Sequence, residues 1–174
     1  LNPWFLDIDY LIEEGFIFIS NLKELGPTNQ NKTHFDFDAA TDLTKKLGHL
    51  LLQGWSSQSK KRKLDFKEWI RKNSWVEDYA IFDVIREEFN MLPWWQWPKE
   101  FKIKNNEFLE SWINTRSEKI LIKKLIQWHL DEQWNAIKKF AKLYDVKLIG
   151  DLPFYVSRDS ADVWSNKSLF SIFK

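Results

Sequence analysis

The chain has 174 residues and a mass of 21.1 kDa, the size of one ordinary domain or of a piece of a larger one. Its 26 Lys and Arg residues nearly balance its 25 Asp and Glu residues, so a net charge of +1 gives no general attraction to nucleic acid or to an anionic membrane. The absence of Cys excludes disulfide scaffolds, thiol catalysis and Cys-type zinc sites.

The start of the sequence predicts an internal segment of a longer protein, because the first residue is Leu1 and the single Met is Met91. No basic and apolar leader follows Leu1, so no signal peptide is expected. No stretch approaches the roughly 18 apolar residues that a membrane helix needs, and we expect no membrane partner.

The first half of the chain predicts short and medium helices. Asp9 suits a helix N-cap and Gly15 a C-terminal stop. A helix is expected over 39–53, with its apolar face on Leu43, Leu47 and Leu50, and Gly54 is expected to end it. The basic run at 60–63 is expected to be a solvated loop rather than a nucleic-acid contact.

The middle of the chain predicts two further helices, over 66–72 and 75–90. Ser74 is a good candidate for the N-cap of the second. Pro93 and Pro98 flank three tryptophans and forbid a regular helix between them. Packing between helices is the favoured role of these tryptophans, and stacking on sugar or bases is the alternative.

The last third predicts the longest helix, over 118–144, where apolar residues recur every three or four positions. An apolar stretch over 146–152 then predicts a buried strand, which would be the second strand of a βαβ unit. The chain is therefore expected to be mostly helical, with about two strands. That is too few to close a sheet, so a helical insertion attached to part of a barrel is favoured.

Asp151 is the best candidate for a functional residue, because it lies at the C-terminal end of the expected strand, where parallel α/β folds bind ligands. Its carboxylate can accept hydrogen bonds from sugar hydroxyls or orient another side chain. The alternative is a turn-forming or helix-capping Asp.

A second candidate lies at Asp159, Asp162 and Trp164. Two carboxylates beside a Trp suit a carbohydrate subsite, since hydroxyls bind carboxylates and a sugar face stacks on an aromatic ring. The alternative is a short helix that begins at Asp159 or Ser160 and has Trp164 buried beneath it.

No cofactor or metal is expected. The three histidines, His34, His49 and His129, are scattered, and none has a second ligand at metal spacing. There is neither a Gly-rich phosphate loop nor a G-x-S-x-G nucleophile motif.

The segment after the long helix resembles the third barrel strand and following loop of the amylomaltases, the 4-α-glucanotransferases also called disproportionating enzymes. The matching residues are Ile149-Gly150-Asp151-Leu152-Pro153-Phe154-Tyr155-Val156, then Asp159-Ser160-Ala161-Asp162-Val163-Trp164. Other stretches match in the same order, namely Asn2-Pro3-Trp4-Phe5-Leu6-Asp7, Trp75-Val76-Glu77-Asp78-Tyr79-Ala80, Leu92-Pro93-Trp94 and Gln133-Trp134.

The resemblance implies an α/β fold, part of a (β/α)₈ TIM barrel with a mostly helical inserted subdomain. It divides the chain into a barrel segment after strand 2 (1–20), a helical insertion (21–115), and a barrel helix with strand 3 and its loop (116–174). It also implies a cytoplasmic enzyme, or a plastid one in a plant or alga.

The activity implied by the resemblance is transfer of α-1,4-glucan segments between maltodextrin chains, with retention, through a covalent glucosyl-enzyme. The partners would be maltooligosaccharides, starch or glycogen. In the family the catalytic carboxylates lie on later strands, so this chain alone is expected to be inactive. Its expected substrate-binding residues are Asp151, Pro153, Ser160, Asp162 and Trp164. The alternative is a non-catalytic module that binds α-glucan or another helical protein, and a nucleic-acid binder is disfavoured by the even charge.

Overall fold

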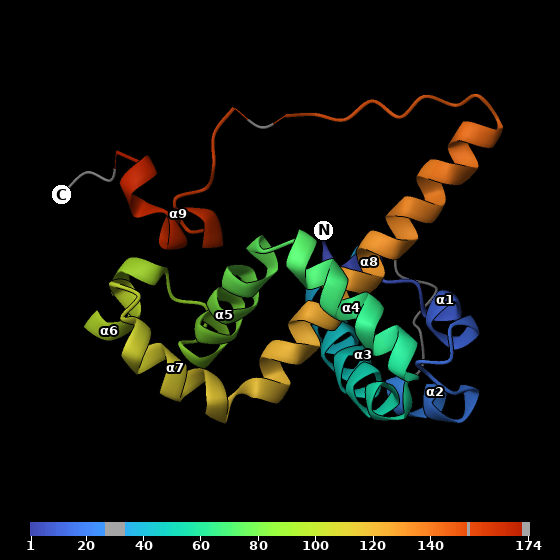
Figure 1. Ribbon diagram of the computed structural model, residues 1–174, viewed down its shortest axis with the longest axis horizontal. Helices are drawn as coiled ribbons and strands as arrows, with labels where there is room; N and C mark the ends of the chain where they lie inside the picture. Colours follow the sequence, from blue (N-terminus) through green and yellow to red (C-terminus); the bar gives the residue numbers. More distant parts are fainter. Residues whose placement is uncertain (27–33, 153, 172–174) are drawn as a thin grey trace. The chain divides into compact units, whose positions relative to one another are not determined.

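The computed structural model describes residues 1–26, 34–152 and 154–171 (Figure 1). Over those ranges its regular structure is helical, without a β-strand, and no helix there is long and apolar enough to cross a bilayer. The α-helices are α1 Ile8–Glu13, α2 Leu22–Leu25, α3 Phe37–Ser57, α4 Lys60–Lys72, α5 Trp75–Glu88, α6 Lys99–Lys102, α7 Asn106–Thr115, α8 Ser117–Leu143 and α9 Ala161–Ser165. Short 3₁₀ turns lie at η1 Pro3–Phe5, η2 Ile19–Asn21, η3 Trp94–Gln96 and η4 Lys167–Leu169.

The contacts of the chain define two compact units. Unit 1 comprises Leu1–Trp69 and Lys124–Leu148, and unit 2 comprises Ile70–Lys123 and Ile149–Lys174. The division into 1–20, 21–115 and 116–174 refers to the parts of a complete barrel and stays a prediction.

In unit 1, α3 extends beyond the predicted stop at Gly54 and ends at Ser57. Gly54 has a different role, since the backbone of Phe16 crosses the helix there. A Cβ atom on Gly54 would lie 2.0 Å from the Phe16 carbonyl oxygen, a distance that no side chain can occupy. The glycine therefore permits close packing between two segments of unit 1, and the helix continues through it.

The basic run at 60–63 is the first turn of α4, which corrects the expected loop. The Ser59 hydroxyl accepts a hydrogen bond from the Arg62 amide at 3.2 Å and so caps the helix. The Arg62 guanidinium donates two hydrogen bonds to Glu132 of α8, at 2.7 and 2.9 Å, and lies 4.4 Å from the centre of the Trp128 ring. A partner for Arg62 on α8 is a tertiary feature that the local pattern does not contain.

Two predicted caps are also wrong. Asp7, and not Asp9, caps α1, because its Oδ1 accepts hydrogen bonds from the amides of Asp9 and Tyr10. Ser74 precedes α5 with helical backbone angles and makes no side-chain capping bond. Gly15 does follow the end of α1 with φ of +72°, a conformation that favours glycine, so the predicted stop is confirmed.

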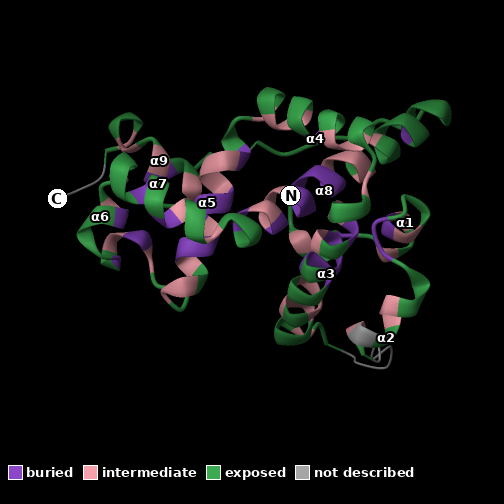
Figure 2. Ribbon diagram, turned by 60° about the horizontal axis from the view of Figure 1, so that its bottom comes forward, coloured by how far each residue is buried: buried purple, intermediate pink, exposed green. Residues whose placement is uncertain are grey.

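Unit 2 has an aromatic core (Figure 2). Its buried tryptophans are Trp94, Trp97, Trp112 and Trp164. The indole N–H of Trp94 donates to the Arg158 carbonyl at 2.7 Å, and that of Trp97 donates to the Leu92 carbonyl at 2.8 Å. Packing is therefore the role of Trp94 and Trp97, as the favoured interpretation of the tryptophan cluster predicts.

The long helix predicted over 118–144 is confirmed as α8. The strand predicted over 146–152 is not formed, and this stretch has no regular structure. Its apolar side chains lie in solvent, with Ile149 97% exposed. A parallel strand is stabilised only through hydrogen bonds to neighbouring strands, and the part of the chain that the structure describes contains none.

Candidate functional site

Asp151 lies in the exposed stretch that follows α8, and its carboxylate faces solvent. The structure therefore does not bring Asp151 together with the other expected site residues through a strand. Pro153, also an expected substrate-binding residue, lies outside the described residues. The roles of both stay predictions.

Ser160 begins α9. Its backbone is extended, with φ of −142° and ψ of 158°, and its hydroxyl accepts a hydrogen bond from the Val163 amide at 3.2 Å. The side chain is thus an N-cap, which stabilises a helix of only five residues. This is the capping alternative that the sequence left open.

Trp164 is fully buried beneath α9, with 0% of its surface exposed. Its indole N–H donates to the Phe101 carbonyl at 2.8 Å, and its ring centre lies 5.8 Å from that of Phe82 on α5. No ring face is open to a sugar. Trp164 packs α9 against α5, and its expected role in substrate binding stays a prediction.

Asp159 fixes the loop before α9. Its Oδ1 accepts a hydrogen bond from the Trp94 amide at 3.2 Å, and its Oδ2 lies 3.3 Å from the Arg86 guanidinium. Both of its oxygens are thus engaged within unit 2. Asp159 holds the loop in place and offers no free oxygen pair to a ligand.

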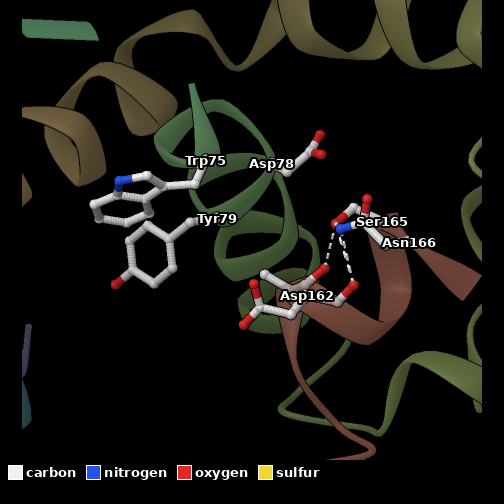
Figure 3. A pocket seen from close by; sticks show the side chains of 7 residues that line it. Trp75, Asp78, Tyr79, Asp162, Ser165 and Asn166 are labelled. Carbon is white, nitrogen blue, oxygen red and sulfur yellow. Dashed lines mark hydrogen bonds between the residues drawn. The ribbon is translucent and has the colours of Figure 1, made fainter. Parts of the chain in front are cut away.

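Asp162 is the expected site residue that lines a pocket. The pocket lies between the first two turns of α5 and the helix α9, and its volume is about 180 Å³ (Figure 3). Its lining residues are Trp75, Asp78, Tyr79, Ala161, Asp162, Ser165 and Asn166. All of them belong to unit 2.

Helical spacing places the α5 residues of the pocket. Trp75, Asp78 and Tyr79 stand at i, i+3 and i+4, which are neighbours on one helix face. The rings of Trp75 and Tyr79 lie 6.1 Å apart and meet edge to face. In Figure 3 these two rings lie together on one side, whereas Asp78 lies on the side of Ser165 and Asn166.

The α9 side of the pocket is ordered by its own hydrogen bonds. The Asn166 amide nitrogen donates to the Asp162 carbonyl at 3.1 Å and to the Ser165 hydroxyl at 2.8 Å. The Ser165 hydroxyl donates to the Ala161 carbonyl at 2.7 Å. The Asp162 carboxylate, by contrast, is exposed.

Two lysines set the charge around the pocket. The Lys104 ammonium lies 2.6 Å from the Asp78 carboxylate and 5.3 Å from the centre of the Trp164 ring. Lys167 donates a hydrogen bond to the Lys102 carbonyl. Burial, together with the positive charge of Lys104, lowers the pKa of Lys167.

Sequence reasoning did not select Trp75, Asp78 or Tyr79 as site residues. Trp75 and Tyr79 stand four residues apart in the helix expected over 75–90, a spacing that is also typical of residues facing a core. The signal that could have identified them is the Trp-Val-Glu-Asp-Tyr-Ala stretch, in which an acid stands between two aromatics on one face.

No group of three or more His, Asp or Glu side chains could hold a metal ion within residues 1–26, 34–152 and 154–171. The pocket itself holds two carboxylates, one of them already paired with Lys104. Its chemistry is that of a binding site for a polar molecule with an apolar face.

Comparison with known proteins yields one family. A family model described as 4-alpha-glucanotransferase matches residues 1–174. The chain is 29% identical to the 4-alpha-glucanotransferase of Clostridium butyricum and 31% identical to that of Synechocystis. Each of these matches includes 99% of this chain. It is 27% identical to a chloroplastic/amyloplastic 4-alpha-glucanotransferase of Arabidopsis thaliana. The chain spans about a third of the length of these relatives.

The fold also matches a solved structure. The amylomaltase from Streptococcus agalactiae in complex with acarbose superposes on 99% of this chain with a TM-score of 0.88 and 24% sequence identity. The match covers 35% of that chain. The fold of the chain thus matches a segment of that structure.

Proposed function

The chain belongs to the 4-alpha-glucanotransferase family, and we propose from this membership that it forms part of an enzyme that transfers α-1,4-glucan segments between maltodextrin chains. The observation that supports the proposal is the family match along residues 1–174. The activity is proposed for the longer protein, since the chain spans about a third of its relatives.

Retaining transfer needs two carboxyl groups about 5 Å apart, one as nucleophile and one as acid and base. The nucleophile forms a bond to the anomeric carbon while the acid protonates the departing oxygen. The 4-hydroxyl of the acceptor then attacks the anomeric carbon and displaces the nucleophile as a free carboxylate, while the same acid, now a base, takes the hydroxyl proton. We assign these two groups to segments outside this chain.

The proposed contribution of Asp151 is to accept hydrogen bonds from a glucose hydroxyl at the mouth of the barrel. Its carboxylate is exposed and free of the packing that occupies Asp159 and Trp164. Pro153 would shape the same loop. Ser160 and Trp164 would act indirectly, since one caps α9 and the other packs it.

The compartment is proposed from the relatives. The Arabidopsis and potato relatives are named as chloroplastic/amyloplastic, and other relatives come from bacteria such as Clostridium butyricum. We therefore propose the cytoplasm for a bacterial protein and the plastid for a plant or algal one.

The test is incubation of the full-length protein with maltotriose. We expect glucose together with maltodextrins longer than maltotriose, because one glucan is transferred to another. Hydrolysis without longer products would contradict glucan transfer. Binding of maltotriose without turnover would favour a non-catalytic α-glucan-binding module.

A further inference from the structure

We propose that the pocket between α5 and α9 binds one glucosyl residue of an α-glucan, with Trp75 as its stacking surface and Asp162 as an acceptor for its hydroxyls. The proposal rests on the proposed glucan-transfer function for the identity of the sugar. It adds a binding role for α5, a helix to which the expected site residues do not belong.

The aromatic side of the pocket suits the apolar face of a sugar ring. Trp75 is 48% exposed, although it is the first residue of a helix that packs into the core of unit 2. Its indole N–H donates to the Asn73 side-chain oxygen at 3.3 Å, which fixes the orientation of the ring. An exposed, oriented indole offers the C–H face of a glucose a large contact at small entropic cost.

The polar side of the pocket suits hydroxyl groups. Asp162 presents an exposed carboxylate, which accepts two or more hydrogen bonds. The Ser165 hydroxyl is held between Ala161 and Asn166. Vicinal hydroxyls of a sugar donate and accept at neighbouring atoms, so they match a carboxylate next to a fixed hydroxyl and amide.

Lys104 reduces the attraction of the pocket for a cation. An aromatic ring beside carboxylates could also bind an organic cation. Here Lys104 already neutralises Asp78 at 2.6 Å, so a cationic ligand would meet an internal positive charge next to the pocket. The volume of about 180 Å³ is smaller than the roughly 300–1,000 Å³ typical of sites for drug-sized ligands, which limits the occupant to about one sugar ring.

The pocket is supported by a rigid floor. Trp164 lies fully buried below α9, and its ring packs against Phe82, which follows Trp75 and Tyr79 on the same face of α5. The Ser160 cap stabilises the start of α9, and the Trp164 hydrogen bond joins α9 to the Phe101 carbonyl of α6. Because these residues are already ordered, binding of a sugar costs little additional conformational entropy.

The direct test is a crystal structure of the full-length protein soaked with maltose. We expect a glucosyl ring stacked on Trp75, with a hydroxyl within hydrogen-bond distance of Asp162. A pocket that stays empty at saturating maltose overturns the proposal, and so does a pocket filled by tetramethylammonium in preference to maltose. Density that appears only at the soak concentration, without the kinetic effect described next, is binding at crystal concentration only and also overturns it.

The matched kinetic test uses maltotriose and four variants. We expect Trp75→Ala and Asp162→Asn each to raise KM about tenfold, equivalent to ~1.4 kcal/mol, with kcat within about twofold. Trp75→Phe should recover most of the loss because it keeps a ring. Glu110→Gln, an exposed acid on α7 of the same unit, should leave KM and kcat unchanged.

The two levels of proposal fail separately. Unchanged KM in Trp75→Ala and Asp162→Asn, in an enzyme that transfers glucan, overturns the pocket and leaves the proposed function intact. An unmodified protein that binds maltose in the pocket but transfers no glucan overturns the proposed function and supports the pocket.

Discussion

The described residues of 146–156 and those of 158–170 are both rich in apolar side chains, yet only the second stretch is packed. In the first, Ile149 and Phe154 are each 97% exposed. In the second, Val163 and Trp164 are buried, and Arg158 and Asp159 are bonded to the neighbourhood of Trp94. The two stretches are neighbours in sequence and differ in whether unit 2 supplies a partner.

This difference shows that apolar composition alone does not make a core. Residues 158–170 find complementary helices, since α9 packs on α5 and the Trp164 N–H reaches the Phe101 carbonyl. Residues 146–152 have the composition of a strand, and a strand needs another strand beside it. Three matched pairs of variants test this contrast between packed and exposed positions, and a fourth pair tests the function expected for the exposed stretch.

The largest effect is expected for Trp164→Ala. The change leaves a cavity beside Phe82 and Trp97 and an unpaired Phe101 carbonyl, so we expect a loss of about 3–5 kcal/mol in the free energy of unfolding. Phe154→Ala, at an exposed ring, should change it by less than about 0.5 kcal/mol. Urea unfolding of the chain followed by circular dichroism measures both. Equal losses of unfolding free energy in the two variants would contradict the contrast between the packed and the exposed stretch.

The next effect concerns activity. Asp151→Asn in the full-length protein should lower kcat/KM for maltotriose by roughly one to two decades, since a lost charge-assisted hydrogen bond costs about 1.5–3 kcal/mol. The melting temperature should stay the same, because the side chain is exposed. Asp145→Asn is the control, as Asn tolerates the φ of +52° found there. Unchanged kinetics in Asp151→Asn would remove Asp151 from the site.

A third pair compares two glycines. Gly54→Ala should destabilise the chain by about 1–3 kcal/mol, because the new Cβ would lie 2.0 Å from the Phe16 carbonyl oxygen and would force α3 away from the segment at Phe16. Gly150→Ala should change the free energy of unfolding by less than about 0.5 kcal/mol, since nothing lies within 4 Å of its Cβ position. Thermal melts of the two variants decide, and a stable Gly54→Ala would contradict the close approach.

The smallest effect is a pH dependence from His129, which is fully buried. Burial lowers the pKa of His129 against the opposing effect of Glu132, whose carboxylate oxygen lies 3.3 Å from Nδ1. Below a pH of about 6.5, His129 therefore binds a proton in the unfolded state and not in the folded state. The free energy of unfolding falls as the pH falls below that value. The slope is at most ~1.4 kcal/mol per pH unit for one proton.

The measurement is urea unfolding at pH 7.5, 6.5 and 5.5. His129→Leu should flatten the dependence over this range, whereas His49→Leu, at an exposed position of α3, should leave it as it is. The same slope in all three proteins would assign the titration elsewhere. Glu132 affects stability at lower pH. Burial raises the pKa of Glu132, but hydrogen bonds from His129 and Arg62 outweigh burial and lower that pKa. The stability that Glu132 contributes is therefore lost as the pH falls below about 4.5.

The partly buried network around Glu132 also raises the pKa of Tyr10. Burial, together with the charges of Glu132 and Glu14, raises the pKa of Tyr10 to about 12. Its hydroxyl lies 3.5 Å from the Glu132 carboxylate, to which it donates. Arg62 compensates both acids, since it also lies 3.3 Å from Glu14. The Arg62 side chain in the first turn of α4 is therefore held by acids that lie far from it in the sequence.

Part of the fold could be predicted from the sequence because helical periodicity is a local property. The stripe of α8 recurs every three or four residues over 117–143, and α5 followed from its own spacing in the same way. The positions of Gly54 and Arg62 could not be interpreted locally. Gly54 looks like a helix stop until the Phe16 backbone is placed beside it, and Arg62 looks solvated until Glu132 is placed opposite.

The candidate site shows the same limit. Asp162 was selected from the sequence because an acid close to a Trp suits a sugar, but that Trp is Trp164, which is buried. The exposed indole that lines the same pocket as Asp162 is Trp75, which lies more than eighty positions earlier in the chain. The capping alternative at Ser160 and the sugar-subsite alternative around Asp162 could not be separated without knowing which ring the helix covers.

The sequence by itself determined that the chain is mostly helical, that α8 is its longest helix and, through the motif at 149–164, that it resembles the amylomaltases. Each of these depends on residues close together in the chain. The tertiary structure decided which apolar segments are buried, which glycine permits a close backbone contact, and which aromatic rings line the pocket of Asp162. Burial and pocket formation depend on pairs of segments far apart in sequence, and no local pattern specifies which pairs meet.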